Sequence, residues 1–181
     1  MVNLNIKVTD QRMNLIEQGI DLAIRIGKLE DNKASLKRKK LTDINHILVA
    51  GKALMQGRQT PQTPKDIENW PWIGLTMLPF YRNISNSQGV SIRLNFQPTI
   101  CVDNVEAMTE LARQGVGLAT VPDYLVADAL LSGELVHLLP EWQIEPIEVF
   151  AVWPIQINKT SLSYFLNGLF VQINFSGKAV L

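Results

Sequence analysis

Cys101, His46 and His137 are the side chains whose types could perform nucleophilic chemistry, with the thiol attacking and an imidazole serving as its base. Cys101 lies in the apolar stretch 99–102, which is typical of a buried, unreactive thiol. The chain contains no Gly-x-Ser-x-Gly elbow, Walker loop or His-Glu-x-x-His helix. A single cysteine excludes a disulfide framework and a cysteine-rich zinc site, and two histidines leave any other metal cage sparse. We therefore predict a protein that is not an enzyme and uses no metal or cofactor, with a small α/β enzyme carrying a dispersed site as the alternative.

Residues 115–120 resemble part of a dinucleotide-binding loop, with the sequence Gly-Val-Gly-Leu-Ala-Thr. Such a loop follows a strand and opens a helix, so that the helix N–H groups face the phosphates. Here the segment lies between an expected helix and the next strand, and the third glycine is missing. The segment is therefore predicted to be a helix stop and tight turn, and a dinucleotide-binding enzyme is rejected.

The charge balance argues against direct binding to nucleic acid or to a membrane. Lys and Arg total 17, and so do Asp and Glu, which gives a formal net charge of zero. The longest basic run, residues 37–40, could contact an anion, but it is more typical of a solvated loop or an edge strand. No apolar run approaches the roughly 18–20 residues of a membrane helix, and the first residues alternate instead of forming a signal peptide. We expect a cytoplasmic protein with no membrane partner.

The first half of the chain shows strand and helix patterns in alternation. Period-two alternation predicts strands over residues 2–8 and 20–27, and apolar residues at helical spacing predict a short helix between them that Gly19 ends. Strand, helix and strand in this order favour a βαβ unit with parallel strands. Further on, residues 46–50 and 72–78 are predicted to be strands, Thr63 is predicted to cap a short helix beginning at Pro64, and residues 81–88 are predicted to be a polar loop.

Residues 99–139 form the most regular block, with the predicted order β-α-β-α-β. The strands are expected at 99–102, 116–121 and 135–139, and the helices are expected to begin at Asp103-Asn104 and Pro122-Asp123. Both helix starts follow a strand, and in open α/β sheets that edge binds small ligands, often anions. Capping of the helix by itself also explains these residues. A strand over 148–153 and an amphipathic helix over 162–173 complete an α/β fold.

The segments so placed resemble, in order and spacing, the effector-binding domain of LysR-type transcriptional regulators. Each segment alone is a weak signal, but the succession is specific and covers almost the whole chain. The matching segments are residues 9–27 with Glu17-Gln18-Gly19-Ile20-Asp21-Leu22-Ala23-Ile24-Arg25-Ile26-Gly27, residues 35–41, residues 49–67 with Thr60-Pro61-Gln62-Thr63-Pro64-Lys65-Asp66-Ile67, and residues 102–122 with Val102-Asp103-Asn104-Val105-Glu106-Ala107, Gly115-Val116-Gly117-Leu118-Ala119 and Val121-Pro122.

The resemblance implies the fold of type 2 periplasmic binding proteins, in which two α/β subdomains are joined by two crossing strands and a ligand cleft lies between them. Carried over, residues 1–48 with 150–181 form the first subdomain and residues 49–149 form the second. The crossings are expected near residues 47–50 and 149–151. A solute-binding protein used for transport shares this fold and is kept as an alternative, although no signal sequence supports it.

The same resemblance implies the residues of the effector site. The first subdomain would contribute Thr9 and the loop at Arg25 and Gly27, although a structural ion pair of Arg25 with Asp21 or with a carboxylate across the sheet is an equal interpretation. In the second, an aromatic ring would stack on the effector while amides at the helix start and the Thr9 hydroxyl hold its polar group. The second-subdomain residues are Leu78, Pro79, Phe80, Asp103, Asn104, Val121 and Pro122.

The implied function is sensing of a small molecule for a transcription regulator, without catalysis. Effector binding would shift the relative orientation of the subdomains and so the geometry of a homo-oligomer. The family favours small organic acids as effectors. DNA binding would require an N-terminal helix-turn-helix domain, which is expected to be absent from this chain, as are the first strand and first helix of the effector domain.

Overall fold

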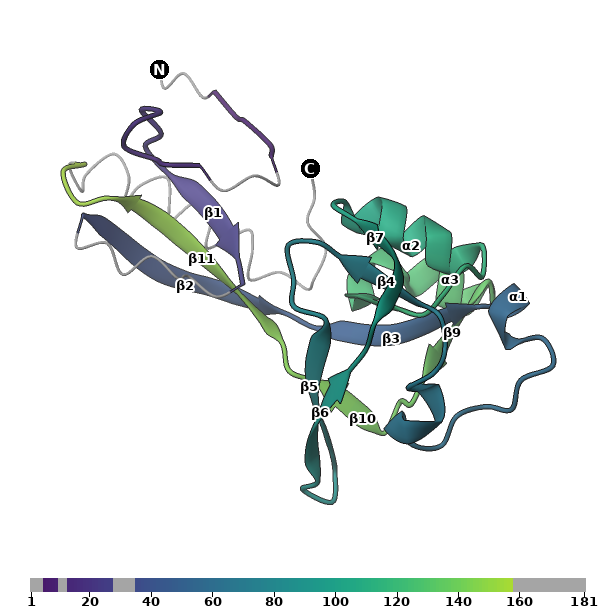
Figure 1. The fold of residues 1–181 in the computed structure, drawn as a ribbon. Coiled ribbons are helices and arrows are strands. Elements are labelled where there is room, and N and C mark those ends of the chain that lie inside the picture. Colours follow the sequence, from purple (N-terminus) through teal and green to yellow (C-terminus); the bar gives the residue numbers. More distant parts are fainter. Residues whose placement is uncertain (1–4, 10–12, 28–34, 158–181) are drawn as a thin grey trace.

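The computed structural model describes residues 5–9, 13–27 and 35–157 of the 181-residue chain (Figure 1). This part is an α/β structure in which short helices pack on small sheets. Its elements in chain order are β1 (Ala23–Ile26), β2 (Leu36–Ile44), β3 (His46–Gly51), α1 (Lys52–Met55), the 3-10 turn η1 (Pro64–Ile67), β4 (Trp72–Leu75), β5 (Tyr81–Asn86), β6 (Ser91–Asn95), β7 (Pro98–Val102), α2 (Val105–Arg113), β8 (Ala119–Pro122), the 3-10 turn η2 (Asp123–Leu125), α3 (Ala127–Leu131), β9 (Leu135–Leu138), β10 (Trp142–Ile144) and β11 (Ile147–Pro154).

One sheet combines the beginning and the end of the described chain, in the order β1-β11-β2. β11 lies in the middle and is antiparallel to both neighbours, and its pairing with β2 shifts register between Val149 and Phe150. β2 lies at the edge of the sheet in the described part of the chain and carries the basic run 37–40. Lys40 contacts Asp43 at 2.7 Å and Glu148 at 3.1 Å, and all three side chains are about half exposed. The run is thus part of a solvated edge strand, as predicted, and such exposed ion pairs contribute little stability.

The larger body is built around β3, which is the central strand of the sheet β8-β3-β9. The side chains of successive residues in β3 point to opposite faces of the sheet and pack into two different apolar clusters. On one face Leu48 joins the cluster of Trp72 and Phe96, whose rings stack at 4.3 Å. On the other face Val49 joins the cluster that includes Met108 of α2. β3 follows β2 after the single residue Asn45, so one extended segment runs from the first sheet into the larger body (Figure 1).

The predicted block 99–139 has its elements in the predicted order, but they do not form a single sheet. β7 pairs in parallel with β4, whereas β8 and β9 both pair antiparallel with β3. Only an isolated bridge between Trp72 and Leu118 connects the two sheets in the described part. Order along the chain predicts neighbours in a sheet only as a tendency, and here the long connection through β5 and β6 brings β4 beside β7.

The predicted N-terminal βαβ unit is wrong for the residues that the structure describes. Residues 5–8 form no strand, and residues 2–4 lie outside the described part. In place of the helix there is one hydrogen-bonded turn, closed where Gly19 N donates to Ile16 O and Ile20 N donates to Leu15 O. Gly19 has φ +63°, so it does end the turn in the left-handed conformation that glycine tolerates. With so few residues before this stop, propagation cannot repay the cost of helix nucleation.

The prediction of a polar loop over 81–88 is also wrong, because residues 81–86 form β5. The hairpin to β6 turns only at residues 87–90, where Asn86 Oδ1 accepts hydrogen bonds from the N–H groups of Gln88 and Val90. Arg82 and Ile84 are buried while their neighbours along the strand are not. Asn and Ser on the outer positions concealed this alternation in the sequence. The predicted helix 162–173 lies outside the described residues.

Candidate functional site

The predicted residues of the second subdomain lie near the carboxyl ends of β4, β7 and β8. Asn104 is the N-cap of α2, and its Oδ1 accepts a 2.8 Å hydrogen bond from Ala107 N. The capping role therefore belongs to Asn104, while the adjacent Asp103 is exposed. Both the cap and the exposed carboxylate lie at the positive end of the α2 dipole. The Asn104 side chain already accepts a hydrogen bond from one N–H group of the first turn. A ligand could therefore bind only the remaining free N–H groups, next to this cap.

The segment Leu78-Pro79-Phe80 follows β4 and combines a partly buried side chain with two exposed ones. Leu78 packs against the apolar cluster that contains Val121. Phe80 is 40% exposed, and its ring centroid lies 6.1 Å from that of Phe96. A Cβ atom on Gly74 would lie 2.8 Å from Phe80 Cε1, so Phe80 covers that glycine. Phe80 thus has one face packed on the protein and enough exposed surface to stack on a ligand.

Val121 and Pro122 are buried, so they pack beneath the proposed site and do not line its surface. Val121 pairs with Ile47 and Pro122 pairs with His46 in the β3–β8 ladder. Just beyond, Asp123 N donates a hydrogen bond to Asn45 O at 3.2 Å. This end of β8 is therefore tied to the junction between β2 and β3.

The first-subdomain residues lie in or beside the sheet β1-β11-β2. Thr9 is exposed. Arg25 Nη2 donates a 2.9 Å hydrogen bond to Met13 O, and the residue opposite Arg25 across the sheet is Phe150, not a carboxylate. Gly27 has φ +87°, and its N–H donates to Glu148 O at 2.9 Å. Arg25 thus has a structural bond to the turn before β1, and its ion pair with Asp21 or with a carboxylate across the sheet stays a prediction.

Two hollows in the described part are lined by residues that sequence reasoning did not select. A groove of about 390 Å³ lies beside the loop 58–62, next to Asp66 and Trp70. A cavity of about 10 Å³ lies between β3, β5, β6, β8, β9 and β10 and contains Arg82 and Thr120. None of the predicted site residues lines either hollow.

A buried polar group beside the β2–β3 junction was also missed by sequence reasoning. Arg82 Nε donates to Thr120 Oγ1 at 2.9 Å, and its Nη1 donates to Pro79 O at 2.6 Å and Tyr81 O at 2.7 Å. Burial lowers the pKa of Arg82 to about 10, which leaves it charged at neutral pH. Its inward position in the alternation of residues 81–86 was the signal that could have revealed it.

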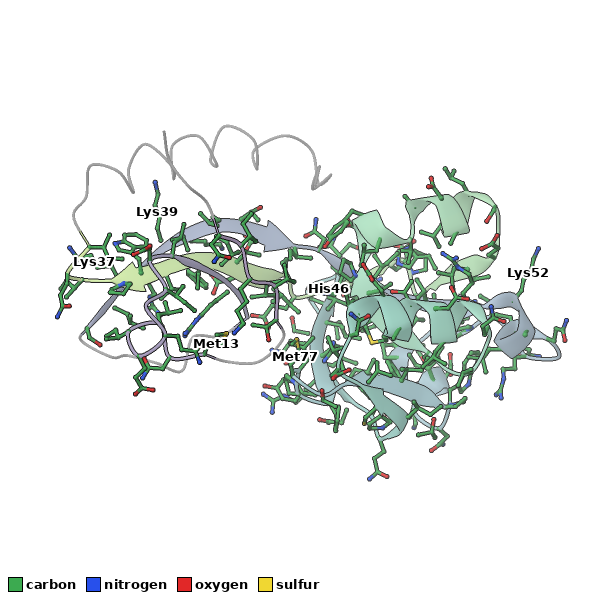
Figure 2. All side chains as sticks on the ribbon, turned by 90° about the horizontal axis from the view of Figure 1, so that it is seen from above. Met13, Lys37, Lys39, His46, Lys52 and Met77 are labelled. Carbon is green, nitrogen blue, oxygen red and sulfur yellow. The ribbon has the colours of Figure 1, made fainter. Side chains whose placement is uncertain are left out.

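His46 lies at the start of β3, between the sheet that carries Lys37 and Lys39 and the larger body (Figure 2). It is buried, and its Nδ1 lies 3.1 Å from Ile44 O. Burial lowers the pKa of His46, and the positive charge of Arg82 lowers it further. His46 is therefore uncharged at neutral pH.

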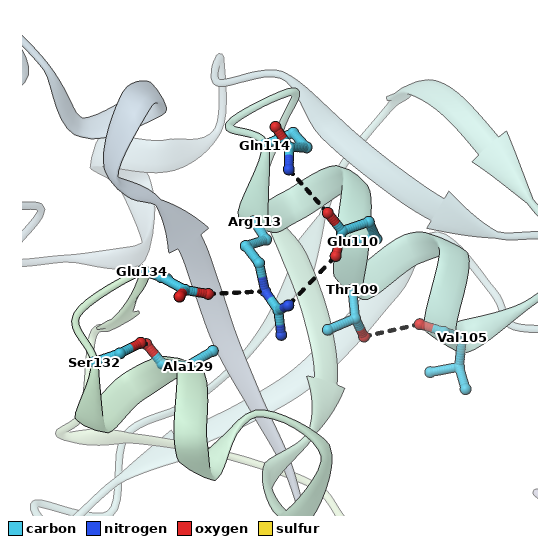
Figure 3. Close-up of polar contacts among 8 residues, drawn as sticks. All are labelled: Val105, Thr109, Glu110, Arg113, Gln114, Ala129, Ser132 and Glu134. Carbon is cyan, nitrogen blue, oxygen red and sulfur yellow. Dashed lines mark hydrogen bonds and ion pairs between the residues drawn. The ribbon is translucent and has the colours of Figure 1, made fainter.

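Polar contacts also fasten α2 to the turn before β9 (Figure 3). Arg113 lies between Glu110 at 3.5 Å and Glu134 at 3.3 Å, and Gln114 Nε2 donates to Glu110 Oε1 at 2.8 Å. Thr109 Oγ1 donates back to Val105 O within the helix. These contacts hold α2 against the turn before β9 and are consistent with a structural role, although the buried Nε of Arg113 forms no hydrogen bond with the described residues.

The prediction that Cys101 is buried is wrong, because the structure places it at the surface. β7 pairs only with β4 in the described part, and its middle residues face outward. The described residues contain no group of three or more His, Cys, Asp or Glu side chains that could hold a metal ion. Within those same residues, no helix is long and apolar enough to cross a membrane.

Comparison with known proteins identifies the family. Residues 1–157 match the LysR substrate binding domain family. The chain is 30% identical over 155 residues to the HTH-type transcriptional regulator PtxR of Pseudomonas aeruginosa, covering 84% of this chain and 49% of PtxR. It is 27% identical over 181 residues to an uncharacterized HTH-type transcriptional regulator of Haemophilus influenzae, covering 96% of this chain and 58% of that protein. The chain thus spans about half the length of these curated relatives.

Solved structures agree on the fold. The regulatory domain of an AphB variant from Vibrio vulnificus aligns with a TM-score of 0.74 at 19% identity, covering 94% of this chain and 83% of that chain. The CrgA regulatory domain from Neisseria meningitidis aligns with a TM-score of 0.69 at 24% identity, covering 88% of this chain and 78% of that chain. The curated relatives are transcriptional regulators and not enzymes. The chain belongs to the LysR substrate-binding domain family and has the α/β, periplasmic-binding-protein-like fold of LysR-type regulatory domains.

Proposed function

We propose that this domain senses a small-molecule effector in a cleft between two subdomains, residues 1–48 with 150–181 and residues 49–149. The observation that carries the proposal is the family match over residues 1–157. The proposed wall consists of Thr9, Arg25, Gly27, Leu78, Pro79, Phe80, Asp103 and Asn104, with the buried Val121 and Pro122 supporting it from beneath.

The chemistry of the second-subdomain wall supports an effector with a flat or apolar body and a polar end. The exposed part of Phe80 offers a stacking surface, and the α2 N-terminus offers N–H groups near Asn104. The partly buried Leu78 and the buried Val121 hold this surface on the core of the larger body. An organic acid fits this set, because the helix dipole favours a negative group at that end.

The two crossing segments are irregular where the subdomains are proposed to meet. Asn45 interrupts the extended chain between β2 and β3. The pairing of β11 with β2 shifts register between Val149 and Phe150, inside the proposed second crossing at 149–151. Irregular positions of this kind can absorb a change in backbone angles, as hinges do. Effector binding would shift the subdomain orientation by its difference in affinity for the two states.

For the whole protein, we propose that this shift controls transcription in a cytoplasmic homo-oligomer that contacts DNA through a helix-turn-helix domain outside this sequence. The curated relatives are HTH-type regulators about twice as long as the matched region, which supports a sensing role within a longer protein.

A thermal-shift screen of this chain against small carboxylates, aromatic acids and amino acids tests the proposal. An effector at about 100 times its Kd adds roughly 2.7 kcal/mol to the free energy of unfolding. For a chain of this size that raises the unfolding midpoint by about 5–11 °C. Phe80→Ala should abolish the shift, whereas Val90→Ala, at an exposed turn position, should leave it unchanged.

Two results would count against the proposal. A shift that survives Phe80→Ala places the effector elsewhere, and turnover of the bound compound favours the enzyme alternative. Asn104→Ser separates ligand contact from capping, because serine keeps a side-chain cap for α2 while it removes the amide group. Under the proposal it weakens effector binding and leaves the unliganded midpoint nearly unchanged.

A further inference from the structure

The backbone that carries Phe80 is held at three consecutive carbonyl groups. Arg82 Nη1 donates to Pro79 O at 2.6 Å and to Tyr81 O at 2.7 Å. The carbonyl between them, Phe80 O, accepts from Phe96 N at 3.1 Å. Two of these three bonds come from one side chain, so the direction in which Phe80 leaves the backbone depends largely on Arg82.

The guanidinium of Arg82 is itself fixed by the core of the larger body. Its Nε donates to Thr120 Oγ1 of β8 at 2.9 Å. Its Cζ lies 5.4 Å from the centroid of the Phe96 ring, which stacks on Trp72 at 4.3 Å. Thr120, Phe96 and Trp72 are all buried. Arg82 therefore ties the segment before β5 to side chains that cannot move freely.

The ring of Phe80 leans on the same group of side chains. Its centroid lies 6.1 Å from that of Phe96, with the two ring planes at 51°. Its Cε1 atom covers Gly74, and the rest of the side chain is exposed. Phe96 thus contacts both the ring of Phe80 and the guanidinium of Arg82. Loss of Arg82 should therefore release the backbone of Phe80 and also loosen the support of its ring.

A buried cation is an unfavourable choice for an inward position of β5. Arg82 is 8% exposed, and in the part of the chain that the structure describes no carboxylate pairs with it. An apolar side chain would avoid the desolvation of the charge, as Ile84 does at the next inward position. The bonds that an apolar side chain could not make are those to Thr120 and to the carbonyls on either side of Phe80.

We propose that Arg82 is the positioning residue for Phe80, anchored by Thr120, and that it holds the ring in the orientation that stacks on a flat effector. The proposal rests on the effector-binding function proposed above, because Phe80 is the stacking surface of that site. Arg82 acts through Phe80 and is not itself proposed to touch the effector.

The first test needs no effector and follows the Phe80 ring directly. Fluorine NMR of the protein labelled with 4-fluorophenylalanine gives a signal for each ring, and the Phe80→Leu and Phe150→Leu variants assign two of them. In Arg82→Met the Phe80 signal should move, whereas that of Phe150, in the sheet β1-β11-β2, should not. Arg93→Met is the matched control, since Arg93 Cζ lies 4.3 Å from the Tyr81 ring but donates no bond to the carbonyls beside Phe80.

The second test compares two acids of similar shape, benzoate and cyclohexanecarboxylate, by isothermal titration calorimetry. Stacking on an aromatic ring strengthens binding by about 2- to 13-fold beyond the effect of buried area. Arg82→Met should therefore lower the ratio of benzoate affinity to cyclohexanecarboxylate affinity by about that factor, while Arg93→Met should leave the ratio unchanged.

An unmoved Phe80 signal in Arg82→Met overturns the positioning role, and so does a movement of the Phe150 signal as large as that of Phe80, which indicates general loss of packing. An unchanged affinity ratio overturns it as well. Should Arg82→Met fail to fold, Thr120→Val decides, because it removes only the anchor of Nε; there too the Phe80 signal must move and the Phe150 signal must not. If the Phe80 signal moves but neither acid binds the unaltered protein, the positioning role is supported and the effector proposal fails for such acids.

Discussion

Gly51→Ala is expected to be among the most damaging single-methyl additions to the larger body. Gly51 ends β3, and a Cβ atom there would lie 2.4 Å from Ala112 O, 2.6 Å from Arg113 O and 2.9 Å from Gly115 N. All three atoms belong to the backbone at the end of α2, so no rotation of a side chain can relieve the contact. The helix must move away from β3, and it is the helix whose first turn carries Asn104.

The loss in the free energy of unfolding depends on which atoms an added Cβ atom would contact at each glycine. Overpacking a core costs about 1–3 kcal/mol, and backbone contacts on this scale put Gly51→Ala at about 3 kcal/mol or more. Gly74 in β4 is the matched control, since its Cβ would meet side-chain atoms of Phe80 and Pro98 at 2.8–3.0 Å. Phe80 can turn aside, the ring of Pro98 in β7 must shift by a few tenths of an ångström, and alanine lowers the entropy of the unfolded chain by about 0.4–1 kcal/mol. Gly74→Ala should therefore cost only about 1 kcal/mol.

Thermal unfolding followed by circular dichroism checks the difference, with urea unfolding as a second measure. The midpoint should fall by about 6–12 °C for Gly51→Ala and by about 2–4 °C for Gly74→Ala. Equal losses in the two variants, or a Gly51→Ala midpoint close to that of the unaltered protein, would refute the reasoning that backbone contact at Gly51 sets the position of α2.

Three further predictions concern the N-cap, a buried histidine and the surface thiol. Asn104→Ala should lower the free energy of unfolding by about 1 kcal/mol, because the hydrogen bond from Ala107 N is lost. Chemical denaturation measures this loss. An equal loss in Asn104→Ser would contradict the capping role. Burial lowers the pKa of His46 in the folded state, so below pH about 6.5 the unfolded chain takes up the proton more readily and stability falls. His46→Gln should remove part of the loss in midpoint between pH 7.5 and pH 5.5, while His137→Gln reports the share of a second histidine whose pKa burial also lowers. Cys101 should react with Ellman's reagent in the folded protein as completely as in urea, and a thiol protected until unfolding would contradict its exposed position.

Much of the block 99–139 could be predicted, because its local signals agree with its tertiary setting. Asn104 caps the helix, Gly115 lies just beyond its end, and the apolar positions between them face the core. The start of η1 at Pro64 was equally readable from the Thr-Pro pair, and there Asp66 Oδ2 accepts from Thr63 N at 2.9 Å. Capping and helix-stop signals of this kind depend only on nearby residues, so they act in the same way in any fold that contains the helix.

The residues at 81–86 show where such reasoning fails. Polar Asn and Ser side chains are typical of a loop, yet the segment pairs with β6 and β10 on its two sides. A strand flanked on both sides has its backbone groups satisfied by partners distant in the chain, and no property of the segment itself reveals them. Arg82 at an inward position was hidden for the same reason.

By itself, the sequence determined the α/β class, the order of most elements and the helix ends. It also carried the resemblance that led to the family. All of these depend on periodicity, caps and motif spacing along the chain. The tertiary structure decided which strands are neighbours, that β11 lies between β1 and β2, and that Cys101 is exposed. It also decided that Arg82 is buried between Thr120 and the backbone around Phe80. These outcomes depend on contacts between residues far apart in sequence, whose energies exist only once the chain has closed on itself.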